Sequence, residues 1–176
     1  MKLKQFNFKK INSTNDTAIR IIMTSNNKFG IVKSELQKKG RGQHGKKWIS
    51  YKGNLFLSFF YALEKINLSI NKLTKFNCSL VKKAISIYYK KKITIKAPND
   101  LLIGDKKICG ILQEIINKLD KKYLIVGIGI NLKTKPIIKN YPTTCLYDLL
   151  DNKPTKEEIV NSLKKIFEQN LSNFYK

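Results

Sequence analysis

A chain of 176 residues, 42% of them hydrophobic and 27% charged, has the composition of an ordinary globular protein and can bury a core within one domain. Its 35 basic residues outnumber the 12 acidic ones and give a formal net charge of +23, which indicates either an acidic partner or a lysine-rich compositional bias; the scattered lysines favour the bias. Three widely spaced cysteines exclude a disulfide framework, and a single histidine excludes a His-rich zinc site.

The first part of the chain predicts one helix and two strands. Ser13 or Thr14 can cap a helix that runs to about Met23. Ile31–Glu35 predicts a short strand, and Asn54–Tyr61 (NLFLSFFY) predicts a strand that is buried on both faces.

The second part predicts two further helices and three strands. Apolar residues at helical spacing predict a long amphipathic helix over about 70–90, and Thr155 with Glu158 forms a capping box for a last helix. The three strands are expected at 93–96, 107–116 and 123–132, with turn signals at 98–100 and 104–105. Strands interspersed with helices predict an α/β or α+β fold with a mixed sheet, in a single domain over residues 1–176.

The N-terminus lacks the apolar core of a signal peptide. No apolar run approaches the roughly 18 residues that a membrane span needs. We therefore expect a cytoplasmic protein that does not act at a membrane.

The glycine loop, which we define as Lys39–Trp48 (KGRGQHGKKW), is the most informative segment of the chain. Its glycines let the backbone approach a ligand closely and turn its amides towards an anion. Its cations add positive charge, and the only tryptophan of the chain offers a flat face for stacking. This combination favours a loop that closes over a nucleotide phosphate.

Three other segments accompany the glycine loop: Ser13-Thr14-Asn15, Lys96–Asp100 (KAPND) with Lys107–Gly110 (KICG), and Gly127–Asn131 (GIGIN). Together the four segments resemble the catalytic domain of biotin–protein ligases, which carries, in this order, an STN segment, a GRGRxGRxW-type loop, a KWPND segment followed by KxxGIL, and a GxGIN strand. The resemblance extends from Ser13 to about Asp151. A dinucleotide-binding reading of GIGIN fails because no third glycine and no helix follow it.

The resemblance implies a two-step reaction. The carboxylate of biotin attacks the α-phosphorus of ATP to give biotinyl-5′-adenylate and pyrophosphate, and a carrier lysine then attacks the mixed anhydride and releases AMP. ATP and biotin are the expected substrates, Mg²⁺ accompanies ATP, and no protein-bound metal site is expected. The expected partner is the biotin carboxyl carrier protein of acetyl-CoA carboxylase, with no nucleic acid, and the protein is expected to be a monomer or a homodimer.

Lys107, Asp100 and Arg41 are the catalytic residues that the resemblance implies. Lys107 would neutralise the biotin carboxylate and the α-phosphate as a point charge, whereas outside its KxxGIL setting it would read as an exposed strand-end lysine. Asp100 would orient Lys107 or the incoming carrier amine, or it would close an Asx-turn after Pro98.

The binding residues come from the same motifs. The residues implied to bind biotin are Ser13, Thr14, Asn15, Gln37, Arg41, Gly42, Gln43, Lys107, Gly110, Gly127 and Gly129. The residues implied to bind ATP and the adenylate are Gly40, Arg41, Gly42, Gln43, Lys46, Trp48, Asn99, Lys107 and Asn131. Ser13 and Thr14 equally suit the role of helix caps, and Trp48, expected on the adenine or on the closed loop, equally suits a core.

The chain departs from the family pattern at two positions. Ala97 stands where the family has a tryptophan, and Gln43 replaces the second arginine of the loop, which puts retention of the adenylate in doubt. We expect neither a winged-helix DNA-binding domain before Ser13 nor a small C-terminal barrel after the last helix.

Two other functions remain open. A lipoate–protein ligase or an octanoyltransferase shares the fold, and octanoyl transfer would need a cysteine nucleophile, for which Cys145 is the candidate; the same residue also suits a small buried position. The net charge of +23 also fits a basic nucleic-acid-binding domain, although the aromatic residues follow apolar patterns rather than alternating with lysines.

Overall fold

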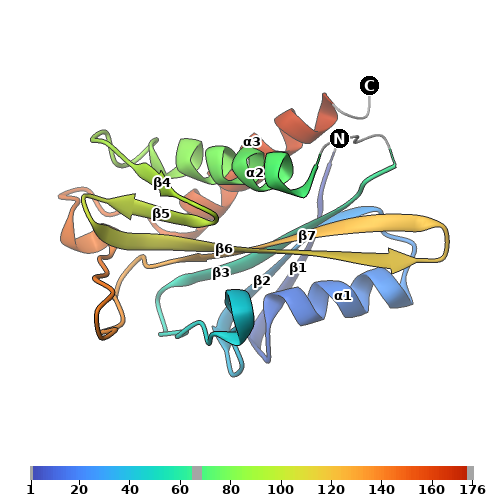
Figure 1. Ribbon diagram of the computed structural model, residues 1–176, viewed down its shortest axis with the longest axis horizontal. Helices are drawn as coiled ribbons and strands as arrows, with labels where there is room; N and C mark the ends of the chain where they lie inside the picture. The colour runs from blue at the N-terminus through green and yellow to red at the C-terminus, as the bar shows by residue number, and fades with distance from the viewer. Residues whose placement is uncertain (1, 65–68, 174–176) are drawn as a thin grey trace.

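The computed structural model describes residues 2–64 and 69–173, which are built around one mixed sheet of seven strands (Figure 1). The strands are β1 (Lys4–Ile11), β2 (Phe29–Gln37), β3 (Leu55–Ala62), β4 (Thr94–Lys96), β5 (Asp100–Ile103), β6 (Lys106–Lys118) and β7 (Lys121–Ile130). Their order across the sheet is β1-β2-β3-β7-β6-β5-β4. Only β1 and β2 pair in parallel, and the other neighbours are antiparallel. The predicted α/β class with a mixed sheet is confirmed.

Three helices flank this sheet, and each begins at a side-chain cap. They are α1 (Thr14–Thr24), α2 (Ile70–Ile85) and α3 (Lys156–Ser172), capped by Ser13, Ser69 and Thr155. The predicted capping box of the last helix is present, because the Thr155 hydroxyl accepts from the Glu158 amide and the Glu158 carboxylate accepts from the Thr155 amide. In the part of the chain that the structure describes, no helix is long and apolar enough to span a membrane.

The two faces of the sheet carry different layers (Figure 1). Helices α2 and α3 cover one face and α1 lies on the other. Strand β7 shows the alternation: Leu124 and Val126 pack in the core of the α2–α3 side, whereas Tyr123 and Ile125 pack on the α1 side. Further along the same side, Gly127 lies under Asn15 at the N-terminus of α1 and Gly129 lies under Trp48, so this helix covers only part of its face.

The sequence missed β1 and β5, and it extended one helix too far. In β1, Phe6 and Phe8 alternate with Asn7 but Lys10 takes the next position, so the apolar alternation of this edge strand is short. β5 has only four residues between two turn signals. The helix predicted to about residue 90 ends at Ile85, where the amides of Ile87 and Tyr88 bond three residues back and tighten the last turn.

Asn54 fastens the segment that follows β7. Its side chain is fully buried, and its Oδ1 accepts hydrogen bonds from the three successive amides of residues 132–134, each at 3.1 Å. Its Nδ2 donates to the carbonyl of Thr134 at 2.9 Å. One amide side chain therefore fixes the exit of the chain from the central strand towards residues 135–145.

Replacing Asn54 by alanine should destabilise the protein markedly, because it leaves buried backbone amides without an acceptor. We expect a loss of about 2–4 kcal/mol, which corresponds to a fall in Tm of roughly 4–16 °C for a chain of this size. Thermal unfolding followed by circular dichroism measures this fall. Asn7→Ala, at an exposed asparagine of β1, serves as the control and should leave Tm within about 2 °C; equal falls for both variants would contradict the role of Asn54.

Candidate active site

A cavity of about 780 Å³ opens on the α1 side of the sheet, beyond the N-terminus of that helix. Its size lies in the range of roughly 300–1,000 Å³ that is common for small-molecule sites. The predicted site residues that line it are Ser13, Asn15, Gln37, Arg41, Gly42, Gln43, Lys46, Trp48, Asn99, Asp100, Lys107, Gly110, Gly127, Gly129 and Asn131. Thr14 and Gly40, the remaining predicted site residues, are buried beside this lining. The structure thus brings together the four segments that the sequence singled out.

Three glycines form the floor of the cavity, which we call the glycine floor: Gly110 on β6, and Gly127 and Gly129 on β7. Gly110 pairs with Gly129 across the two strands. A Cβ atom on Gly127 would lie 2.2 Å from Asn15 Oδ1, and one on Gly129 would lie 2.4 Å from the ring of Trp48. Side chains of α1 and of the glycine loop therefore lie directly on bare backbone, and no larger residue fits here.

Trp48 lies against the floor rather than in the main core. Its ring covers Gly110 and Gly129, and its indole Nε1 is buried without a hydrogen-bond partner among the described residues. The Lys107 ammonium lies 5.3 Å from the ring centroid, within the range of a cation–π contact. The only tryptophan of the chain thus links the glycine loop to the predicted catalytic lysine.

Lys107, Asp100 and Tyr141 form one charged cluster. Lys107 Nζ lies 2.7 Å from Asp100 Oδ1, and the Tyr141 hydroxyl donates to Asp100 Oδ2 at 2.5 Å. Burial and the hydrogen bond and charge of Asp100 raise the pKa of Tyr141, so its hydroxyl keeps its proton. Asp100 therefore lies where it can orient Lys107, which is one of the roles that the sequence left open for it.

The segment around Tyr141 is attached to the backbone of Lys107. The Lys107 amide donates to the Pro142 carbonyl at 2.9 Å, and the Thr144 amide donates to the Lys107 carbonyl at 2.9 Å. Asn131 Nδ2 donates to the Thr144 carbonyl at 3.1 Å from the other side. The backbone of Lys107 is therefore fixed in an isolated parallel β-bridge with Thr143 and is not a free strand end.

A polar chain runs under the N-terminus of α1. The Ser58 hydroxyl, buried in β3, lies 2.5 Å from Asn15 Oδ1 and 2.8 Å from Thr14 Oγ1. Gln37 Oε1 accepts from the Thr14 amide at 2.8 Å, and Gln37 Nε2 donates to Ser50 Oγ at 3.1 Å. Three of the predicted biotin-binding residues are thus joined in one network at the edge of the cavity.

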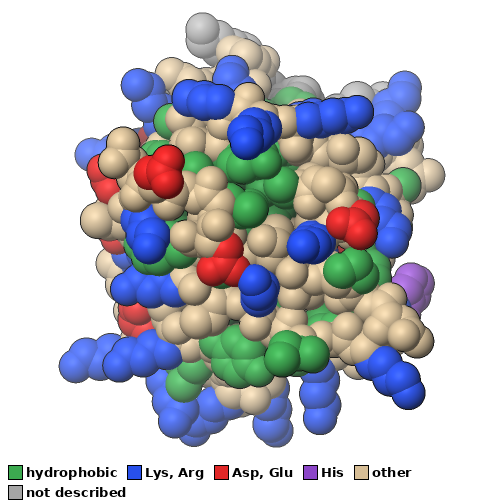
Figure 2. Space-filling view, turned by 90° about the vertical axis from the view of Figure 1, so that its left-hand side faces the viewer, with side chains coloured by type: hydrophobic (Ala, Val, Ile, Leu, Met, Phe, Trp, Pro, Cys, Tyr) green, Lys and Arg blue, Asp and Glu red, His purple; other side chains and the backbone are tan. Residues whose placement is uncertain are grey.

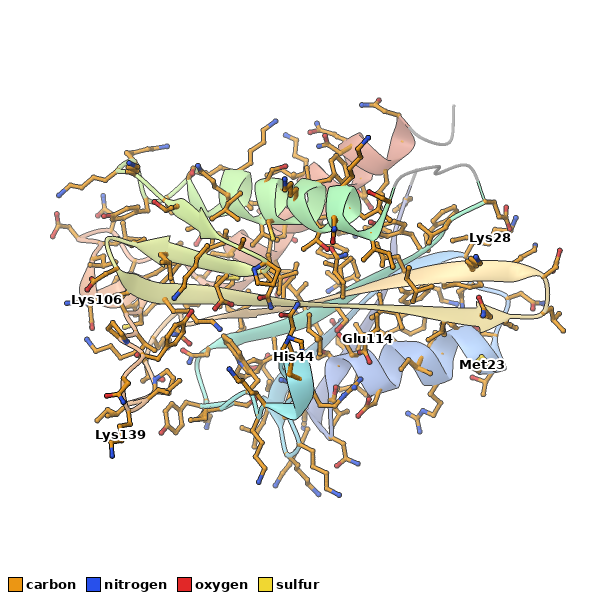
Figure 3. The ribbon with its side chains drawn as sticks, in the orientation of Figure 1. Met23, Lys28, His44, Lys106, Glu114 and Lys139 are labelled. Carbon is orange, nitrogen blue, oxygen red and sulfur yellow. The ribbon has the colours of Figure 1, made fainter. Side chains whose placement is uncertain are left out.

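Arg41 is held by two carboxylates. It donates to both oxygens of Glu114, at 2.9 and 2.7 Å, and lies 2.7 Å from Asp16 Oδ1. Glu114 also accepts from Asn15 Nδ2 at 2.7 Å. Burial alone would lower the pKa of Arg41, but the hydrogen bonds and charges of Glu114 and Asp16 raise it, so the guanidinium stays charged. Figure 3 shows Glu114 pointing from β6 into the space between α1 and the loop that carries His44.

Cys145, the candidate nucleophile, lies outside this cavity. Its thiol is buried and donates to the Lys133 carbonyl at 3.5 Å. Burial raises the pKa of the thiol, which disfavours the thiolate that a nucleophile needs. The structure therefore supports the small buried position for Cys145 and not octanoyl transfer.

Sequence reasoning missed Glu114, Tyr141 and Ser58. Ser58 is the lone polar residue inside an apolar strand, and Glu114 is the only acidic residue of β6, which are signals that could have been used. Tyr141 carries no comparable signal, because its contact with Asp100 depends on how residues 135–145 fold back.

The chain is similar in sequence to known proteins. A model of the biotin/lipoate A/B protein ligase family matches residues 7–131. The chain is 33% identical over 106 residues to the bifunctional ligase/repressor BirA of Escherichia coli, covering 59% of this chain and 33% of that protein. It is 32% identical over 151 residues to biotin–protein ligase 2 of Arabidopsis thaliana, covering 77% of this chain and 43% of that protein. The chain thus spans less than half the length of these two curated relatives.

A solved structure shares the fold over nearly the whole chain. The biotin protein ligase from Aquifex aeolicus, in complex with biotin and ATP, superposes with a TM-score of 0.82 at 28% sequence identity. The match covers 97% of this chain and 71% of that chain.

Alanine substitutions at two positions of the glycine floor should have different effects on Trp48. Gly129→Ala should displace the Trp48 ring, so the emission of this single tryptophan should shift to the red as water reaches it. Gly127→Ala should disturb Asn15 instead and leave the emission maximum unchanged. Steady-state fluorescence of folded protein, verified by circular dichroism, measures both; equal spectra for the two variants would contradict the placement of Trp48.

Proposed function

The chain belongs to the biotin/lipoate A/B protein ligase family, and we propose that it attaches biotin to a lysine of a carrier protein through biotinyl-5′-adenylate. Supporting this are the relatives named biotin–protein ligase and the likeness to a structure that holds biotin and ATP. The observation that carries the proposal is the Lys107–Asp100 pair at 2.7 Å, placed in one cavity with the buried polar network of Asn15 and Gln37.

The polar network favours biotin over lipoate. The ureido ring of biotin offers one acceptor and two N–H donors, whereas the dithiolane ring of lipoate offers no N–H or carbonyl group. Ser13 and Asn15 line the cavity and are almost fully buried, Thr14 lies buried behind them, and Gln37 adds an amide beside them. A site whose buried polar groups need partners binds a polar ring better than an apolar one.

Adenylate formation requires two anions to approach each other. In this proposal the Lys107 ammonium lies between the biotin carboxylate and the α-phosphate and offsets their repulsion while the carboxylate oxygen attacks phosphorus and pyrophosphate leaves. Asp100 fixes the position of Lys107, and Tyr141 holds the other oxygen of Asp100. The ammonium is thus oriented before the substrates arrive, which reduces the reorganisation that the transition state requires.

The second step transfers the acyl group. The ε-amine of the carrier lysine attacks the carbonyl carbon of the mixed anhydride, and AMP leaves with its phosphate oxygen. We propose that the carrier is the biotin carboxyl carrier protein of acetyl-CoA carboxylase and that Mg²⁺ arrives with ATP, held mainly by phosphates and water. A reducing compartment such as the cytoplasm suits the three buried free thiols.

Pyrophosphate exchange into ATP tests the first step without any carrier. Biotin should support exchange, and neither lipoate nor the omission of an acid should do so. Lys107→Ala should lower the biotin-dependent exchange by about 100-fold or more, because the main cation at the reacting atoms is lost. If exchange depends on lipoate alone, the substrate is lipoate and not biotin. Full exchange by Lys107→Ala would refute the role of this residue.

Cys145→Ser should leave the rates of exchange and of carrier modification within about twofold of the wild-type rates, because the thiol lies outside the cavity. Mass spectrometry of the carrier measures the modification. Loss of modification with normal exchange would restore a cysteine-dependent acyl transfer.

A further inference from the structure

The glycine loop is tied at both of its ends to one continuous polar network. At its N-terminal end Arg41 bonds to Glu114, and Glu114 accepts from Asn15 Nδ2 at 2.7 Å. Asn15 leads through Ser58 and Thr14 to Gln37. At the C-terminal end, Gln37 Nε2 donates to Ser50 Oγ, which lies 3.4 Å from the Trp48 carbonyl.

Glu114 is the charged member of this network on the sheet. It lies on β6 and is the register partner of Ile125 on β7, so its backbone is fixed on one side by this central strand. Its carboxylate accepts hydrogen bonds from both Arg41 of the loop and Asn15 of α1. Three elements far apart in the sequence therefore meet at one side chain.

The geometry of the Arg41 contact favours a fixed loop. Two parallel hydrogen bonds between a guanidinium and a carboxylate define direction as well as distance, unlike a contact between point charges. The side chains of Arg41 and Glu114 are 39% and 25% exposed, so the pair is partly shielded from solvent. Asp16, the second partner of Arg41, is 48% exposed and contributes a weaker, more screened contact.

We propose that Glu114 is a positioning residue that holds the glycine loop closed over the cavity and couples the loop to Asn15. It touches no reacting atom, because its two oxygens are taken up by Arg41 and Asn15. The loop carries Trp48 and the glycine backbone, both of which the family resemblance assigns to binding of the adenylate. The inference deepens the proposed function and rests on it only for the identity of the ligand that the loop covers.

Limited digestion with trypsin tests the position of the loop without any substrate. The loop contains four cleavage sites, at Lys39, Arg41, Lys46 and Lys47. Glu114→Gln keeps the shape of the side chain and removes its charge, and we expect cleavage within the loop to become at least about fivefold faster. Cleavage at Lys121 and Lys122, the first residues of β7 beside the turn at 119–120, should keep its rate.

Glu64→Gln is the matched control, because Glu64 also joins two cations, Lys28 and Lys121, but lies away from the loop. It should leave cleavage of the loop unchanged. Arg41→Lys, which breaks the paired bonds from the loop side, should open the loop as Glu114→Gln does. The double variant should be cut no faster than either single one, because both changes remove the same contact. Wild-type cleavage in Glu114→Gln, or additive effects in the double variant, would overturn the proposal.

A second measurement follows the fate of the intermediate. In Glu114→Gln we expect at least about threefold more biotinyl-adenylate in solution per carrier modified, and a higher KM for biotin because a neutral amide replaces the carboxylate that accepts from Asn15. An unchanged ratio and KM would contradict the coupling to Asn15. If the unchanged protein forms no adenylate with biotin, the proposed function fails, whereas the digestion experiment still decides the role of Glu114.

Discussion

The close approach allowed by Gly110, Gly127 and Gly129 is the constraint on which the rest of the site depends. The N-terminus of α1 and the glycine loop come from distant parts of the sequence, yet Asn15 and Trp48 lie on the same strip of strand backbone. Because these side chains rest on bare backbone, Asn15 reaches both Ser58 and Glu114, and Trp48 reaches Lys107. The hydrogen bonds of the site are a consequence of this packing, since a single Cβ on the floor would displace them.

The two central cations of the site are both paired before any substrate binds. Asp100 holds Lys107, and Glu114 with Asp16 holds Arg41. Such pairing lowers the attraction for an anion at long range, but it fixes where each positive charge lies. The lysines that line the cavity without an ion pair among the described residues are Lys46, Lys47, Lys96 and Lys139. Figure 2 shows lysines spread widely over its face of the molecule, which agrees with a compositional origin for much of the net charge.

Much of the fold and of the site could be predicted from the sequence, for identifiable reasons. The strand at 54–61 and the capping box at Thr155 are local patterns, and both are present. Lys107 and the glycines were predicted through the resemblance of four ordered motifs to a known family, since a lysine or a glycine taken alone carries little information in this chain. Glu114 and Tyr141 were not predicted. The role of Glu114 depends on the strand register and that of Tyr141 on how residues 135–145 fold back, and no local pattern encodes either. Edge strand β1 was not predicted because lysines interrupt its apolar alternation.

Under the proposed function, the ring of the acid and its reacting carboxylate occupy neighbouring but separate parts of the cavity. Asn15 lies over Gly127, whereas Trp48 and Lys107 lie over Gly110 and Gly129. Two residues along β7 span about 7 Å, so an acid whose ring is bound at the polar network can place its carboxylate at Lys107 across a short apolar chain. Changes in the polar network would then alter which acid binds without altering the cation that activates it. Under the proposed function, this separation would make the buried amides and hydroxyls, rather than Lys107, the determinants of the acid.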